Sequence, residues 1–368
     1  MIEVAQNGDQ FCHIEPEKHD SPGDSCGANI AQKRIGFCPT RAQAAREPVC
    51  LQLHIQCDSI AAARRTAELS RIMVSENNFE LHVTVTRAAI PQTQQHWIDT
   101  LGTWPRFHRR LRIPGRPLLT NLAAYPRCVL VAGCQRSGTT MLTRLIAGAS
   151  GFARLGLTTD DELDAALALA GLIELPPAHR YCFQTTYLNE CFADYAALRR
   201  DQRLIWVLRN PYSVVYSMLY NWRRWALAEL YAGCGIRPDA TRRMRRAWWF
   251  WPLGPSQLEK ACYAYAGKVA QIRAIRELVP REQLLVVDYD RLVTAPTEWL
   301  PRIFEFAGAN YDPAFALKIR PDPARKADRL GSRARELIET VAAPVYRDCL
   351  ALAAEATRPE RELSHGAI

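Results

Sequence analysis

The sequence of 368 residues is longer than a typical single domain, so we expect one large domain with an accessory region. Its apolar runs stay below the ~18 residues that a membrane-spanning helix needs, and its cysteines form no C-x-x-C pair of the kind found in zinc ribbons and thioredoxin-like proteins. The net charge of +9, carried by 41 Arg and 6 Lys, favours an anionic ligand. The first residues lack a signal-peptide pattern, and we expect a cytoplasmic protein with no membrane span.

The first third of the chain gives weak signals. Residues 1–46 show neither helical nor strand periodicity, and we interpret them as a loosely ordered leader. In residues 47–124, "LQLHI" alternates as a strand does, residues 59–74 carry a helical stripe, and "FELHVTVTR" alternates again. This pattern predicts a small βαβ accessory region, followed by a basic connector rich in proline.

Residues 125–368 alternate clearly between strands and helices. We predict strands over "CVLVAGC", "RLIWVLR" and "QLLVVDY", with helices from Thr140, from Tyr212 and through "WLPRIFEFAG". Buried strands that alternate with amphipathic helices indicate an α/β fold, in which helices flank a parallel sheet as in P-loop NTPases. Ligands of such sheets bind at the carboxyl ends of the strands.

The first predicted strand ends in "GCQRSGTT", residues 133–140. A glycine turn before a helix presents backbone N–H groups to an anion, although such a turn can also be a structural junction. Thr139 stands where a nucleotide-binding loop has the lysine that holds the β- and γ-phosphates. The loop therefore suits a phosphate-like ester group better than a triphosphate, with Arg136 as a cationic donor.

The second predicted strand ends in "RNPYSVVYS", residues 209–217. Arg209 lies at its carboxyl end, and Asn210 and Pro211 follow as typical first residues of a helix. Ser217 lies about two helical turns further on. Arg209 and Ser217 could together bind a second phosphate.

Together, the two motifs resemble those of sulfotransferases that use 3'-phosphoadenosine 5'-phosphosulfate (PAPS), and "VVDYDRLVTAPTEWLPRIFEFAGANYD" is similar to a third segment of that family. The resemblance covers roughly residues 125–325. It implies PAPS as co-substrate, no metal, and donor-binding residues at Gly133, Gln135, Arg136, Ser137, Gly138, Thr139, Thr140, Arg209 and Ser217. Arg136 is also expected to be catalytic. It takes the place of a lysine of the cytosolic branch, and an arginine at this place resembles the carbohydrate and protein-tyrosine branches.

Sulfuryl transfer needs a base that takes the proton of the acceptor hydroxyl. The cytosolic members place a lysine and a histidine where this chain has Gln184 and Thr186, and this departure argues against a histidine base. The resemblance to the other branches directs attention to Asp160, Asp161 and Glu162. These acids could also cap a helix; we favour Asp161 as the base, with the choice among the three open.

Several alternatives remain. "QLLVVDYD" also fits a strand that ends in a magnesium-binding acid, Asp288, as in a nucleotide kinase or phosphotransferase, and a non-catalytic nucleotide-binding relative is a further alternative. Residues 222–252 interleave Trp and Arg, and could form a lid over the acceptor or an ordinary helix pair; binding of nucleic acid is not expected. The expected acceptor is a hydroxyl of a small molecule, glycolipid or carbohydrate.

Overall fold

A six-stranded parallel sheet forms the frame of the protein. The computed structural model describes residues 2–6, 10–14, 70–74, 81–111, 116–177, 179–235, 254–319 and 328–356. In the order of the sheet, the parallel strands are β4 (Leu81–Thr86), β6 (Phe152–Gly156), β7 (Arg180–Gln184), β5 (Val129–Gly133), β8 (Arg203–Leu208) and β9 (Leu284–Asp288). The strand before the glycine loop, β5, therefore lies between β7 and β8.

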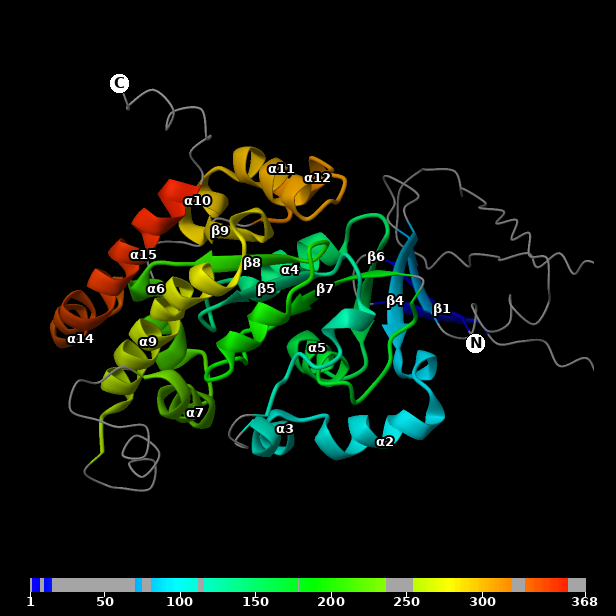
Figure 1. Cartoon of the computed structure of the whole chain (residues 1–368), viewed down its shortest axis with the longest axis horizontal. Coiled ribbons are helices and arrows are strands. Elements are labelled where there is room, and N and C mark those ends of the chain that lie inside the picture. The colour runs from blue at the N-terminus through cyan, green and yellow to red at the C-terminus, as the bar shows by residue number, and fades with distance from the viewer. Residues whose placement is uncertain are drawn as a thin grey trace, which may run out of the picture.

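Helices cover both faces of this sheet, because alternate residues of the buried strands point to opposite sides. Val129 and Val131 of β5 belong to a core with α4 (Thr139–Ala147), α11 (Pro296–Phe306) and α12 (Ala314–Leu317). Leu130 and Ala132 belong to a second core, with α5 (Asp161–Leu169), α6 (Pro211–Tyr220), α7 (Arg224–Cys234), α9 (Gln257–Leu278) and α15 (Ala343–Ala356). Figure 1 shows α11 and α12 above the sheet and α7 and α9 below it.

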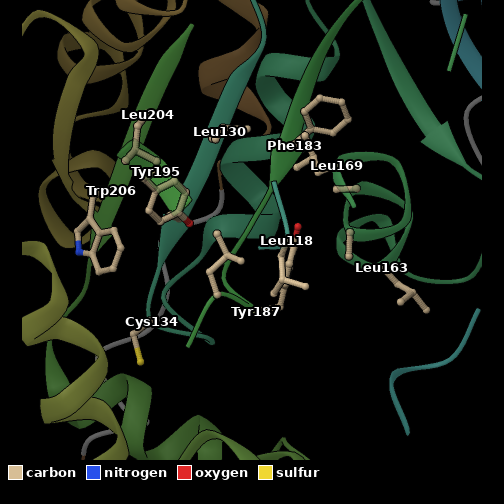
Figure 2. Packing of buried hydrophobic residues seen from close by; sticks show 14 of the residues in the cluster. Leu118, Leu130, Cys134, Leu163, Leu169, Phe183, Tyr187, Tyr195, Leu204 and Trp206 are labelled. Atoms are coloured by element: carbon tan, nitrogen blue, oxygen red, sulfur yellow. The ribbon is translucent and has the colours of Figure 1, made fainter. Parts of the chain in front are cut away.

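The second core is built from large side chains of neighbouring strands. Figure 2 shows Leu130, Phe183, Leu204 and Trp206, which come from β5, β7 and β8 and are all fully buried. The remaining helical segments are α2 (Gln92–Leu101), α3 (Trp104–Leu111), α10 (Tyr289–Thr294), α14 (Ser332–Leu337), a π-helical turn (Ile338–Ala342) and the 3-10 turns Arg87–Ala89, Leu122–Ala124, Phe192–Ala197 and Arg281–Gln283.

The predicted α/β fold is confirmed, as are its three strands over 129–133, 203–208 and 284–288. The helix after β8 begins where the sequence indicates. Asn210 is its N-cap and accepts a hydrogen bond from Ser213 N, and Pro211 occupies the first turn, where no N–H is needed.

The N-terminal part differs from the prediction. Two antiparallel strands, β1 (Ile2–Gln6) and β2 (Gln10–Ile14), occur where we expected an irregular leader. The Asn7–Gly8 dipeptide between them is a hairpin signal that periodicity alone misses. The last five residues of the predicted helix over 59–74 form β3 (Ser70–Val74), which pairs antiparallel with β4 and parallel with β1. Pairing along β4 thus outweighs the local helical pattern.

The described part of the accessory region joins the main sheet. β4 pairs with β6, and Val85, Ile98 and Phe107 share the second core with Leu130. The predicted strand over 51–55 and the start of the predicted helix lie outside the described residues, as does the tryptophan-rich end of the 222–252 segment. Among the described helices, none has the length and apolar character required to cross a membrane.

Candidate active site

The loop between β5 and α4 forms a concave site for an anion. Arg136 and Gly138 both adopt left-handed backbone conformations, with φ of 71° and 92°, which turn the chain sharply into the helix. Gly138 is the N-cap of α4 and has no side chain, and within the described part of the chain no side chain caps the N–H groups of the first turn. The Ser137 hydroxyl is fully buried and has no hydrogen-bond partner among the described residues. An anion with several oxygens would satisfy these donors.

Tyr289 joins this loop to the ends of β8 and β9. Its ring lies against Gly138, and the guanidinium of Arg209 lies over the same ring, 4.5 Å from its centroid. Nη1 of Arg209 also donates a hydrogen bond to the carbonyl oxygen of Arg136 at 3.3 Å. The two predicted motifs and the segment after β9 therefore meet at one edge of the sheet.

Arg136 connects the two motifs directly, because its Nε donates a hydrogen bond to Oγ of Ser217 at 3.0 Å. Burial, and then the charge of Arg209, lower the pKa of Arg136. Within the described part of the chain, no carboxylate forms an ion pair with Arg136. Two guanidinium groups at one site are a costly arrangement that a bound polyanion would relieve.

The backbone around Arg209 is held from two sides. Asp290 accepts hydrogen bonds from the backbone N of Asn210 at 2.8 Å and from its Nδ2 at 2.6 Å. The buried hydroxyl of Tyr265 donates to the carbonyl oxygen of Arg209 at 2.7 Å. These contacts fix the direction from which the Arg209 side chain approaches the loop.

Two of the three candidate acids have structural partners at the start of α5. Asp160 is the N-cap and accepts from the backbone N of Glu162 at 3.0 Å, and Nε1 of Trp104 donates to its other oxygen at 2.6 Å. Asp161 forms an ion pair with Arg144, with its Oδ2 at 2.6 Å from Nε. The predicted capping role of this segment is therefore present, with Asp160 as the N-cap.

Glu162 is the acid that faces the glycine loop. Nε2 of Gln184 donates to Glu162 Oε2 at 3.1 Å and also to Thr139 Oγ1 at 3.2 Å, while the Thr186 hydroxyl donates to Glu162 Oε1. Burial raises the pKa of Glu162 to about 8; the hydrogen bond from Thr186 opposes this rise, and the charge of Asp160 adds to it. A carboxyl group with a pKa near neutrality, one side chain away from an anion site, is suited to proton transfer.

Gln184 and Thr186 thus hold the acid in place. The sequence comparison drew attention to these positions only because they lack the lysine and histidine of another branch. Gln135, which is also predicted to bind the donor, donates from Nε2 to the carbonyl oxygen of Thr186 at 2.8 Å and to Asn189 Oδ1 at 3.0 Å. It therefore connects the glycine loop to the segment that carries Thr186.

Asp288, the possible magnesium ligand of a kinase, has a structural role. Its buried carboxylate is the N-cap of α10, and Oδ1 accepts from the backbone N of Asp290 at 3.0 Å and of Arg291 at 3.3 Å. These hydrogen bonds account for an acid at the end of β9 without a metal ion.

The family comparison agrees with this geometry. Residues 185–321, a little over a third of the chain, match the family model described as a sulfotransferase domain. The matched stretch contains the Arg209–Ser217 motif and the Tyr289 segment, and begins after the glycine loop and Glu162. It confirms the resemblance to sulfotransferases over these residues.

Solved structures with some similarity carry the same family name. One is a sulfotransferase from Alicyclobacillus acidocaldarius, with 15% identity and a TM-score of 0.39, where the match covers 62% of this chain and 98% of that chain. Another is sulfotransferase STF9 from Mycobacterium avium, with 15% identity and a TM-score of 0.38, where the match covers 72% of this chain and 86% of that chain. A third is mouse sulfotransferase SULT7A1 complexed with PAP, with 12% identity and a TM-score of 0.33, where the match covers 66% of this chain and 95% of that chain. No curated protein sequence matches the chain.

Proposed function

We propose that this chain, whose residues 185–321 match a sulfotransferase domain, transfers a sulfuryl group from PAPS to an acceptor hydroxyl. The hydrogen bond between Arg136 and Ser217 carries this proposal, since it brings two anion-binding motifs together at one sheet edge. A donor with phosphate groups at both its 5' and 3' positions needs two such motifs side by side.

The residues present fit this donor. The free N–H groups at the start of α4 and the buried hydroxyl of Ser137 would hold its 5' end, as would Gly133, Thr139 and Thr140. Arg209 and Ser217 would hold the 3'-phosphate. Tyr289 supports both ends, because its ring contacts the loop and Arg209.

In the proposed mechanism, Glu162 is the general base, in place of Asp161, which is engaged by Arg144. When bound, the donor supplies the sulfuryl group and leaves as 3'-phosphoadenosine 5'-phosphate. Glu162 takes the proton of the acceptor hydroxyl as the new oxygen–sulfur bond forms, and Arg136 stabilises the negative charge that remains on the leaving phosphate oxygen. The proton ends on Glu162 and the electron pair of the broken bond on the nucleotide.

The acceptor side of the site consists of Glu162, Gln184, Thr186 and the aromatic residues beside Asp160. Trp104 packs near Tyr187, with ring centroids 5.9 Å apart. Trp104 donates a hydrogen bond to Asp160, and Tyr187 directly follows Thr186 in the sequence. This composition suits a hydroxyl on a small molecule, glycolipid or carbohydrate, with an apolar or ring surface next to the reacting oxygen.

A thermal-shift experiment tests the donor. We expect 3'-phosphoadenosine 5'-phosphate to raise the melting temperature without magnesium, because a ligand at a hundred times its dissociation constant stabilises a protein by about 2.7 kcal/mol. ADP, which carries both of its phosphates at the 5' position and none at the 3' position, is the comparison ligand. Stabilisation by ADP only, and only with magnesium, would favour a nucleotide kinase instead; binding of the bisphosphate without any turnover of PAPS would favour a non-catalytic relative.

A further inference from the structure

A buried lysine lies behind the candidate active site. Lys268, in the middle of α9, is 1% exposed, and its Nζ donates a hydrogen bond to the carbonyl oxygen of Leu188 at 3.0 Å. Its ammonium group also lies 5.8 Å from the ring centroid of Trp206. Figure 2 shows Trp206 on β8 and Cys134 at the end of β5, and both belong to the core that α9 covers. A lysine is among the residues least often found so deep in a protein.

The segment that Lys268 contacts connects the acid with the glycine loop. Thr186 donates to Glu162, and its carbonyl oxygen accepts from Gln135. Asn189 accepts from the same Gln135 side chain through Oδ1. Leu188 lies between these two residues in the sequence, so the hydrogen bond from Lys268 to its carbonyl oxygen helps to position the segment that carries Thr186 and Asn189.

Gln271 makes the same kind of contact without a charge. It lies one turn after Lys268 on α9, and its Nε2 donates to the carbonyl oxygen of Asn189. A neutral amide is therefore sufficient to hold this segment, whereas burial of an ammonium group is unfavourable. The positive charge of Lys268 needs a different explanation from the hydrogen bond.

No carboxylate within the described residues forms an ion pair with Lys268. Burial lowers the pKa of Lys268, and the ionisable groups that oppose this lowering are, in order, the thiols of Cys234 and Cys134, the carboxyl group of Glu162 on α5, and the thiol of Cys191. Burial raises the pKa of the buried Cys134 thiol, and that of Cys191, so both stay neutral. Glu162 is the carboxyl group among these neighbours, and the buried charge can stabilise its ionised form.

We infer that Lys268 is a positioning residue of the proposed sulfuryl transfer, whose buried ammonium group holds the 186–189 segment and favours the ionised form of Glu162. This inference rests on the proposed role of Glu162 as the base. Lys268 does not contact the reacting atoms: it acts through the Leu188 carbonyl and through its electric field. Other groups that act on Glu162 are Asp160, which favours the protonated form, and Thr186, which favours the ionised form.

Infrared spectroscopy can follow the protonated carboxyl group of Glu162 directly as the pH is raised. Its carbonyl stretch is identified as the band that disappears in Glu162→Gln, which separates it from Asp164, whose pKa burial raises to about 6. We expect the midpoint of this band to rise clearly in Lys268→Met, because the loss of a nearby positive charge disfavours the ionised form of the carboxyl group. Gln271→Met, which loses a neutral hydrogen bond to the same segment, should leave the midpoint within a few tenths of a unit.

An unchanged midpoint in Lys268→Met would overturn the inference, and so would an equal rise in Gln271→Met, which would assign the effect to the hydrogen bonds alone. If Lys268→Met does not fold, Lys268→Gln retains a donor for Leu188 without the charge, and the same two outcomes decide. The measurement needs neither donor nor acceptor. A failure here therefore differs from a failure of the proposed function, which the nucleotide thermal shift tests separately.

Discussion

The ring of Tyr289 occupies the space that a side chain at Gly138 would need. A Cβ atom added to Gly138 would lie 2.0 Å from Cε2 of Tyr289, and the φ of +92° at this position is itself unfavourable for any other residue. The loop and the segment after β9 can approach so closely only because position 138 is glycine.

We therefore expect Gly138→Ala to be more destabilising than an alanine at an open left-handed position. Gly151, with φ of +80° and no atom within 4 Å of an added Cβ, is the matched control. Gly151→Ala should cost about 1–2 kcal/mol for the backbone conformation alone, and Gly138→Ala at least about 1 kcal/mol more for the contact with Tyr289. Urea denaturation measures both; equal losses would show that Tyr289 moves aside freely.

Arg209→Ala should weaken binding of 3'-phosphoadenosine 5'-phosphate. A charged hydrogen bond to a phosphate contributes about 1.5–3 kcal/mol, so the dissociation constant should rise by about 10- to 100-fold in isothermal titration calorimetry. Arg203→Ala, at the opposite end of β8, is the control and should bind normally. Wild-type affinity in the Arg209→Ala variant would show that Arg209 does not bind the 3'-phosphate.

Arg136→Ala should mainly slow the reaction. Removal of a donor that stabilises charge on the leaving group costs about 100- to 1,000-fold in rate in well-studied enzymes. The assay is release of 3'-phosphoadenosine 5'-phosphate from PAPS in the presence of candidate acceptors. Arg144→Ala, on α4 but paired with Asp161 at the surface, serves as control. Comparable rates in the two variants would contradict the role of Arg136.

Glu162→Gln should abolish the acid limb of the pH–rate profile, which in the wild type should rise with pH, reach its midpoint near pH 8 and level off above that pH, where the base is ionised. Asp161→Asn should retain the profile, since Asp161 has its own partner in Arg144. A profile that follows Asp161 would return the role of base to that residue.

The same carboxyl group should affect stability, with a definite sign. Because the folded pKa of Glu162 is raised, the native state retains a proton that the unfolded state releases. The stabilisation of the folded state by this protonated carboxyl group is fully present below the unfolded pKa and is lost as pH rises through the folded pKa of about 8. Glu162→Gln should therefore become progressively more stable relative to the wild type across this range, measured by denaturation at several pH values. A difference that does not change with pH would contradict the raised pKa.

The parts of the fold and site predicted well are those whose signal is local. β5, β8 and β9 are unbroken apolar runs, and Asn210–Pro211 marks a helix start by its own chemistry. β3 could not be found in this way, since its pairing with β4 is a tertiary contact that overrides a helical stripe. The choice of Glu162 over Asp161 likewise depends on which side of α5 faces Gln184, and that follows from the packing of α5 on the sheet.

The position of β5 between β7 and β8 has a consequence for how such a protein can diversify. On the proposed assignment, the groups for the nucleotide follow β8 and β9, while the base lies on α5 and its partners lie at the end of β7 and just after it. The glycine loop separates these two halves and is shared by both. Substitutions on the β7 side can therefore remodel the choice of acceptor while the nucleotide half is left intact, and changes in the two halves should combine additively where they share no partner.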